Sequence, residues 1–140
     1  EWMPGLVKEK GVDLEKAESI DMREYIYNMP TVMAAADVMI SRAGSSTCNE
    51  IAAAGLPCIL IPSPNVTNNH QEKNARVLEA RGGAVVVLEK DCTPEALYAT
   101  VKELLADPQR RSEMGRNLRS MVLPDSTDRI CNIVENLAKK

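Results

Sequence analysis

The chain has 140 residues, of which 44% are hydrophobic and 26% charged, and its formal net charge is −3. These values are typical of one soluble globular domain that buries a substantial core. The acidic balance and an aromatic content of only 3% argue against a nucleic-acid partner, because such surfaces are basic and single strands stack on aromatic rings. No apolar run has the length of a membrane span and no signal-peptide pattern opens the chain, so we expect a cytoplasmic protein.

Four cysteines, Cys48, Cys58, Cys92 and Cys131, are widely spaced and form no C-x-x-C motif. The single histidine, His70, is near none of them in the sequence. We therefore expect reduced thiols in the core and no metal site.

The first third of the chain predicts three elements. Residues 1–18 indicate a helix followed by a loop. From Ser19 to Tyr27 apolar and charged residues alternate, which predicts a strand that ends at a turn. Asn28-Met29-Pro30 is a helix-start signal, and a short helix is predicted from about Pro30 to Ala36.

The rest of the chain is organised around residues 35–57. Val38 to Ile40 predicts a short strand, and a helix ended by Gly55 and Pro57 follows a turn of small residues that starts at Gly44. The first N–H groups of a helix lack intrahelical partners and carry the positive end of its dipole, so they can take a phosphate. We interpret Gly44 to Thr47 as a cradle for a diphosphate.

A second interpretation of this turn needs no ligand. Thr47 and Glu50 have the spacing of a capping box, in which each side chain satisfies an unpaired N–H of the other residue. Both residues would then serve only the start of the helix.

Strands and helices alternate through the second half of the chain. Cys58 to Ile61 is continuously apolar, as expected of a parallel strand covered on both faces, and Ala84 to Leu88 is a further strand of the same kind. A polar loop from Pro62 to Asn69 leads to a helix that runs from His70 to Arg81. Three more helices are predicted, beginning at Thr93-Pro94, Asp107-Pro108 and Asp125-Ser126, and all three are expected to be structural.

This alternation predicts a doubly wound parallel sheet flanked by helices, with right-handed crossovers. Three connections would converge on the carboxyl edge of that sheet: Tyr25 to Asn28, Gly44 to Glu50, and Pro62 to Asn74. Their small, hydroxyl and amide side chains suit a polyhydroxylated anionic ligand such as a nucleotide sugar.

Four ordered motifs resemble the MurG family. They are R-E-Y-I-Y-N-M-P at 23–30, D-V-M-I-S-R-A-G at 37–44, E-I-A-A-A-G-L-P at 50–57 and I-P-S-P-N-V-T-N-N-H-Q-E-K-N-A at 61–75. The members of this family are peripheral-membrane glycosyltransferases that transfer N-acetylglucosamine from UDP-N-acetylglucosamine to lipid I, making lipid II for peptidoglycan. The resemblance implies the Rossmann-like C-terminal half of a GT-B enzyme, and covers nearly the whole chain.

By this resemblance, residues 1–140 are a partial C-terminal UDP-sugar-binding domain. The first strands of that domain and the whole N-terminal acceptor domain, with its general base, are not in the sequence. We therefore expect no catalytic residue here, little or no turnover of lipid I by this piece alone, and a sheet left open at one edge. Contact with the cytoplasmic face of the membrane would be made only by the full-length protein.

The resemblance also assigns roles at the donor site, without any cofactor or metal. Ile26 would meet the uracil through its backbone, Ser45, Ser46 and Thr47 would hold the diphosphate after Gly44, and Glu50 would accept hydrogen bonds from the ribose. Transfer would be a single displacement with inversion, in which the helix terminus stabilises the departing UDP.

Four further residues are implied at the same site. Gln71, helped by Asn74, would bind sugar hydroxyls, because an amide is both donor and acceptor. His70 stands where some relatives carry Gln and is expected to form a hydrogen bond rather than act as a base. Arg42 would either offset the charge of the leaving group or pair structurally with a carboxylate.

Two other interpretations of the sequence stay open. One is another GT-B family, either a diacylglycerol glycosyltransferase or a UDP-N-acetylglucosamine 2-epimerase, although an epimerase needs acid–base residues that a single histidine hardly supplies. The other is a non-catalytic interaction domain in which the turns are only scaffold.

Overall fold

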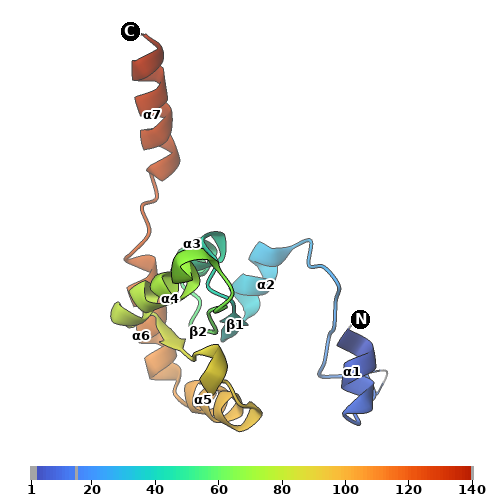
Figure 1. Ribbon diagram of the computed structural model, residues 1–140. Helices are drawn as coiled ribbons and strands as arrows, with labels where there is room; N and C mark the ends of the chain where they lie inside the picture. The colour runs from blue at the N-terminus through green and yellow to red at the C-terminus, as the bar shows by residue number, and fades with distance from the viewer. Residues whose placement is uncertain (1–2, 15, 140) are drawn as a thin grey trace.

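The computed structural model describes residues 3–14 and 16–139, and a small parallel sheet lies at the centre of the chain (Figure 1). Its strands are β1 (Met39–Ser41), β2 (Cys58–Leu60) and β3 (Ala84–Val86), hydrogen-bonded in the order β1-β2-β3. In the register of the sheet, Ile40 lies beside Ile59, which lies beside Val85. The predicted parallel sheet is confirmed, and each strand falls within one or two residues of its expected position.

The sheet is accompanied by helices, of which the first and the last extend away from it (Figure 1). They are α1 (Met3–Glu9), α2 (Met29–Ala35), α3 (Ser45–Ala54), α4 (His70–Ala80), α5 (Pro94–Ala106), α6 (Pro108–Arg119) and α7 (Ser126–Ala138), with 3-10 turns η1 (Thr67–Asn69) and η2 (Glu89–Asp91). Two predicted helix starts are confirmed in detail. The Thr93 hydroxyl accepts a hydrogen bond from the Ala96 N–H at 3.2 Å, and the Asp107 carboxylate accepts one from the Arg110 N–H at 2.8 Å.

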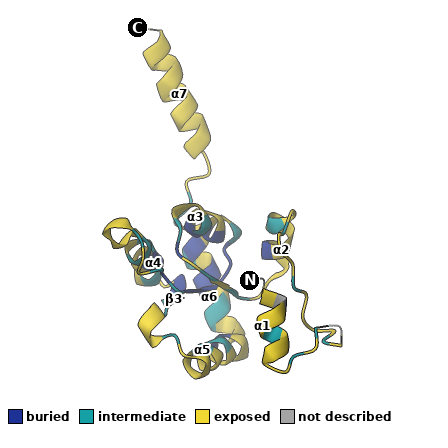
Figure 2. Cartoon of the chain, turned by 45° about the vertical axis from the view of Figure 1, so that its right-hand side comes forward, coloured by how far each residue is buried: buried dark blue, intermediate teal, exposed yellow. Residues whose placement is uncertain are grey.

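The core has two parts because β2 is buried on both faces. Figure 2 shows the buried residues gathered in the middle of the body. Cys58 and Leu60 belong to one buried cluster, to which α3 and α4 contribute the most other members and α6 contributes Leu118. Ile59, which points to the opposite face, packs with Leu104 and Met114 of α5 and α6. A strand covered on both sides can be apolar throughout, which explains why this run lacks alternation.

The strand predicted from Ser19 to Tyr27 is wrong. In the structure this segment is irregular, and among the described residues none of it pairs with a strand. Its polar groups contact each other locally instead, as when the Arg23 guanidinium binds Asp21. Alternation of apolar and charged residues can give a strand one apolar and one polar face, but the strand forms only where a neighbouring strand can pair with its backbone.

The expectation of four core thiols holds only in part. Cys48 and Cys58 are buried, and burial raises the pKa of the Cys58 thiol to about 12. Cys92 is half-buried, whereas Cys131 is exposed, so the prediction is wrong for Cys131. All four thiols are free.

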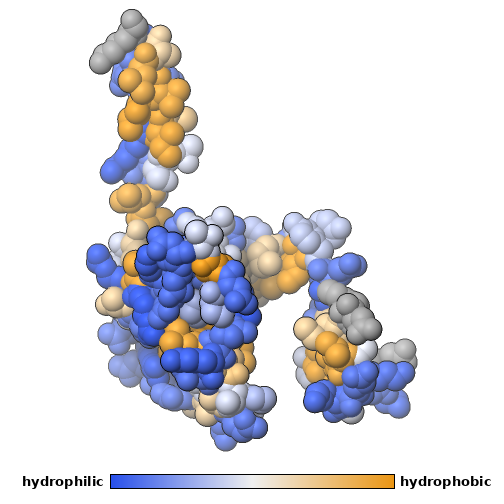
Figure 3. Space-filling view, in the orientation of Figure 1, coloured by the Kyte–Doolittle hydropathy of each residue, from blue (hydrophilic) through white to orange (hydrophobic). Residues whose placement is uncertain are grey.

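Cys131 is exposed because α7 extends away from the body of the molecule (Figures 1 and 2). The helix carries an apolar stripe, visible as an orange band in Figure 3, formed by Ile130, Ile133, Val134 and Leu137, and each of these side chains is about 60% exposed. The predicted helix is thus confirmed, but its apolar stripe faces solvent. No helix in the described part of the chain has both the length and the hydropathy to cross a bilayer.

Candidate functional site

The N-terminus of α3 opens at the carboxyl end of β1. Gly44 is the N-cap residue in an extended conformation, and the first helical hydrogen bond runs from the Cys48 N–H to the Gly44 carbonyl at 2.9 Å. The N–H groups of Ser45, Ser46 and Thr47 precede this bond, and within the described residues no side chain caps this end of the helix. Three adjacent backbone donors are therefore available at the positive end of the helix dipole.

The alternative interpretation of this turn, a capping box of Thr47 and Glu50, is wrong. Because α3 already begins at Ser45, Thr47 is the third residue of the helix and Glu50 lies one turn further on. Neither side chain is placed to cap the helix. Glu50 is exposed and borders a hollow of about 390 Å³ between α2 and α3, which Met29 and Met33 also line.

The backbone before the turn is held from two neighbouring elements. The Ile61 N–H donates to the Ser41 carbonyl at 2.9 Å, which extends the pairing of β1 with β2. The Asn74 amide, from α4, donates to the carbonyl of the fully buried Ala43 at 3.1 Å. These contacts fix the approach to Gly44 from the sheet and from the next helix.

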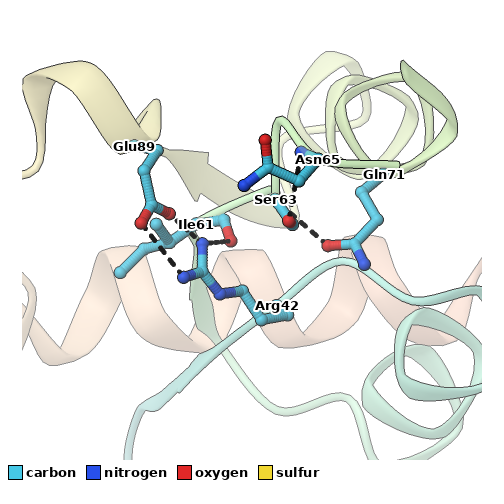
Figure 4. Close-up of polar contacts among 6 residues, drawn as sticks. All are labelled: Arg42, Ile61, Ser63, Asn65, Gln71 and Glu89. Atoms are coloured by element: carbon cyan, nitrogen blue, oxygen red, sulfur yellow. Dashed lines mark hydrogen bonds and ion pairs between the residues drawn. The ribbon is translucent and has the colours of Figure 1, made fainter. Parts of the chain in front are cut away.

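Arg42, also at the end of β1, pairs with a carboxylate that lies far away in the sequence (Figure 4). Both of its terminal nitrogens contact Glu89: Nη1 bonds Oε2, and Nη2 lies 3.2 Å from Oε1. Nη1 also donates to the Ile61 carbonyl at 3.1 Å. The hydrogen bond holds the pKa of the Glu89 carboxyl below its ordinary value and raises the pKa of Arg42, so both groups are charged at neutral pH.

The loop after β2 is organised around the start of α4. The Ser63 N–H donates to Oε1 of Gln71 at 3.0 Å, which leaves the NH₂ group of that amide as the part able to donate outward (Figure 4). Asn68 and Asn69 adopt left-handed conformations, with φ of 56° and 51°, and these turn the chain into the helix. The Thr67 carbonyl accepts a hydrogen bond from Nδ1 of His70 at 2.9 Å.

Four of the predicted residues, Ser45, Asn74, Glu50 and Arg42, line three different hollows rather than one cleft. Ser45 and Asn74 line a hollow of about 590 Å³ that lies among α3, α4 and residues 121–126. Arg42 lines another, of about 410 Å³, with Glu89 and Cys92. Ile26 lies half-buried in the irregular segment before α2 and lines neither of these nor the hollow beside Glu50.

Sequence reasoning missed two residues that shape this edge. Ser63 supplies the N–H that orients Gln71, and Glu89 supplies the carboxylate that holds Arg42. Glu89 follows the third strand closely, so the rule that ligands and their supports collect at the carboxyl ends of parallel strands could have singled it out. Across residues 3–14 and 16–139, no group of three or more His, Cys, Asp or Glu side chains is arranged to hold a metal ion.

Residues 5–130 match the model of the glycosyltransferase family 28 C-terminal domain. Two relatives carry the name UDP-N-acetylglucosamine--N-acetylmuramyl-(pentapeptide) pyrophosphoryl-undecaprenol N-acetylglucosamine transferase. The protein from Acetivibrio thermocellus is 45% identical over 124 residues, which is 89% of this chain and 34% of the relative. The protein from a Thermoanaerobacter species is 46% identical over 135 residues, or 92% of this chain and 37% of the relative.

A solved structure, MurG from Acinetobacter baumannii, superimposes with a TM-score of 0.77 at 29% identity over 84% of this chain and 33% of that protein. The glycosyltransferase VinC, solved in complex with dTDP, superimposes equally well, with a TM-score of 0.77 at 19% identity over 97% of this chain and 33% of that protein, and at this identity it supports the fold alone. The chain spans about a third of the length of the relatives it matches. By the match over residues 5–130, the chain belongs to the glycosyltransferase family 28 C-terminal domain family, and the resemblance to MurG is confirmed.

Proposed function

We propose that this chain is the donor-binding part of an inverting N-acetylglucosaminyltransferase that converts lipid I to lipid II. It would bind UDP-N-acetylglucosamine, and the acceptor would meet the donor through a second domain at the cytoplasmic face of the membrane. The observation that carries this proposal is the uncapped N-terminus of α3, which opens at the carboxyl edge of a parallel sheet. The relatives whose printed name states this donor and this type of acceptor support it.

The N–H groups of Ser45, Ser46 and Thr47 would bind the diphosphate of the donor. Fixed backbone dipoles favour negative charge, and this charge grows on UDP as its bond to the sugar breaks. An acceptor hydroxyl that attacks the anomeric carbon would displace UDP in one step, with inversion. The helix terminus would then stabilise the leaving group without a metal ion.

The other predicted residues would act on either side of the diphosphate. The exposed Glu50 carboxylate borders an apolar hollow next to Met29, which suits a nucleoside whose base is flat and whose ribose offers hydroxyl donors. We assign Ile26 to the base, Gln71 to the sugar hydroxyls through its free NH₂ group, and His70 to a hydrogen bond at the rim.

A titration tests this function. Amide NMR spectra of the chain would be followed while UDP-N-acetylglucosamine, UDP or UDP-glucose is added. We expect shifts centred on residues 44–50 and on Gln71, with tighter binding of the N-acetyl sugar than of UDP-glucose. Absence of shifts at millimolar concentrations of all three ligands would contradict donor binding by this chain.

A pair of variants separates the backbone donors from the hydroxyls. Ser45→Pro removes one N–H at the first helical position, where proline is tolerated because this N–H has no helical partner. Ser45→Ala keeps the N–H and removes only the hydroxyl. We expect UDP affinity to fall by about tenfold in the proline variant, the effect of one charge-assisted hydrogen bond, and to change little in the alanine variant.

A further inference from the structure

The guanidinium of Arg42 connects the carboxyl ends of all three strands. Arg42 directly follows β1, and Ile61, whose carbonyl accepts from Nη1 at 3.1 Å, directly follows β2. Glu89 opens η2 shortly after β3 and binds both terminal nitrogens of Arg42. The pairing is of the forked, two-contact kind, which fixes orientation as well as distance.

This arrangement lies next to the turn that begins α3. Arg42 lies two residues before Gly44, so the position of its side chain and the path of the main chain into α3 are coupled. Other contacts that hold residues 41–43 are neutral hydrogen bonds, from the Ile61 N–H to Ser41, from the Asn74 amide to Ala43, and from the Ser41 hydroxyl to the Arg42 carbonyl at 3.0 Å. Glu89 therefore supplies the charged contact among these, and it comes from a third element of the fold.

We infer that Glu89 is a positioning residue for the diphosphate turn: by pairing with Arg42 it fixes the backbone that presents the N–H groups of Ser45 to Thr47. This inference rests on the proposed function, since it gives the turn its ligand. It also gives Arg42 a structural task, because its guanidinium is engaged by Ile61 and Glu89 (Figure 4).

If the pair only stabilised the fold, its loss would lower the melting temperature and leave the binding of ligands unchanged. The Arg42 and Glu89 side chains are 53% and 46% exposed, and pairs of this exposure contribute little to global stability. Loss of the pair should therefore leave the melting temperature nearly unchanged and act on the geometry of the turn. Binding of a diphosphate then responds, whereas binding of a nucleoside without phosphates does not.

The test compares Glu89→Gln with a matched control, Glu79→Gln. The control breaks the pair between Glu79 and Arg76 on α4, whose side chains are 37% and 45% exposed. The first measurement is the amide NMR spectrum without ligand, where we expect shifts at residues 43–47 in Glu89→Gln and none there in Glu79→Gln. Glu89→Asp, which keeps the charge on a shorter side chain, should give smaller shifts.

The second measurement is a calorimetric titration with UDP and with uridine. We expect Glu89→Gln to weaken UDP binding by about two- to fivefold, within the range that a half-exposed pair can transmit, and to leave uridine binding unchanged. The control should match the parent chain for both ligands.

The outcomes separate the two proposals. If the parent chain binds UDP and Glu89→Gln binds it equally well or more tightly, the inference fails and the donor site stands. If the parent chain does not bind UDP, the donor-binding function fails, and the spectra without ligand alone decide whether Glu89 positions the turn. Unchanged amides at residues 43–47 in Glu89→Gln overturn the inference in either case.

Discussion

The Asn74 side chain donates a hydrogen bond to the main-chain carbonyl of Ala43 at 3.1 Å, so α4 is tied directly to the turn that precedes α3. The carbonyl belongs to a residue with no exposed surface, where an acceptor without a partner is costly. Asn74 also lines the hollow beside Ser45. The Asn74 amide nitrogen thus supports the turn before α3, while its oxygen can still accept a hydrogen bond from a ligand.

Asn74→Ala should weaken binding of UDP as well as of UDP-N-acetylglucosamine. Removal of the hydrogen bond leaves the Ala43 carbonyl unsatisfied and loosens the turn, an effect of about 1 kcal/mol, or about fivefold in affinity. Calorimetric titration of the variant with each ligand measures both losses. If only the sugar nucleotide lost affinity, Asn74 would act as a sugar ligand alone and the tie to Ala43 would not matter for binding.

Glu50→Ala should separate binding from stability. Because Glu50 sits inside α3 and does not cap it, and because alanine is a good helix former, the free energy of unfolding should change by less than about 0.5 kcal/mol. Affinity for uridine and UDP should fall by about fivefold or more, since the ribose loses a charged acceptor. Urea unfolding and calorimetry give the two numbers. A loss of stability of about 1 kcal/mol with unchanged affinity would contradict a role of Glu50 in ligand binding.

Much of the fold could be predicted because its signals are local. The apolar run from Cys58 to Leu60 reflects a strand buried on both faces, and Gly44 and Gly55 bound α3, the latter with a left-handed φ of 63°. The free N–H groups at the N-terminus of α3 were predicted from the same stretch of sequence. Each of these features depends on residues that are close together in the sequence, so the amino-acid sequence alone was sufficient to predict them.

The contacts that support the site could not be predicted in the same way. Arg42 and Glu89 are 47 residues apart, and only the order of strands in the sheet brings them together. The segment from Ser19 to Tyr27 was predicted as a strand from its local alternation of apolar and charged residues. A strand also needs a hydrogen-bonded neighbour, which the local sequence does not reveal. The periodicity of α7 predicted a helix, and it contained no information on what its apolar stripe would face.

Gly115→Ala should destabilise the fold although it adds a single methyl group. A Cβ atom on Gly115 would lie 2.7 Å from the carbonyl oxygen of Gly55, where α6 packs against the end of α3. Relief requires the two helices to separate, which costs about 1–3 kcal/mol. Urea unfolding measures this loss. Gly5→Ala is the control, since a Cβ there meets nothing within 4 Å, and equal stability of the two variants would contradict the close packing.

The Arg42–Glu89 pair contributes little to stability, and this small contribution should depend on pH in one direction only. The hydrogen bond from Arg42 holds the pKa of the Glu89 carboxyl below its ordinary value of 4.5, so the folded state binds this proton less readily than the unfolded state. The contribution is therefore complete above pH 4.5 and is lost as the pH falls through the lowered pKa of the folded state.

The difference in unfolding free energy between the parent chain and Glu89→Gln isolates this contribution, because all other carboxyl groups titrate in both proteins. We expect the difference to be constant from pH 7 down to about 5 and to shrink toward zero in more acidic solution, as the carboxylate takes up its proton. Since both side chains are about half exposed, added salt should reduce the plateau as well. A difference that grew on acidification would mean that the folded state favours the protonated carboxyl, which is incompatible with the pairing to Arg42.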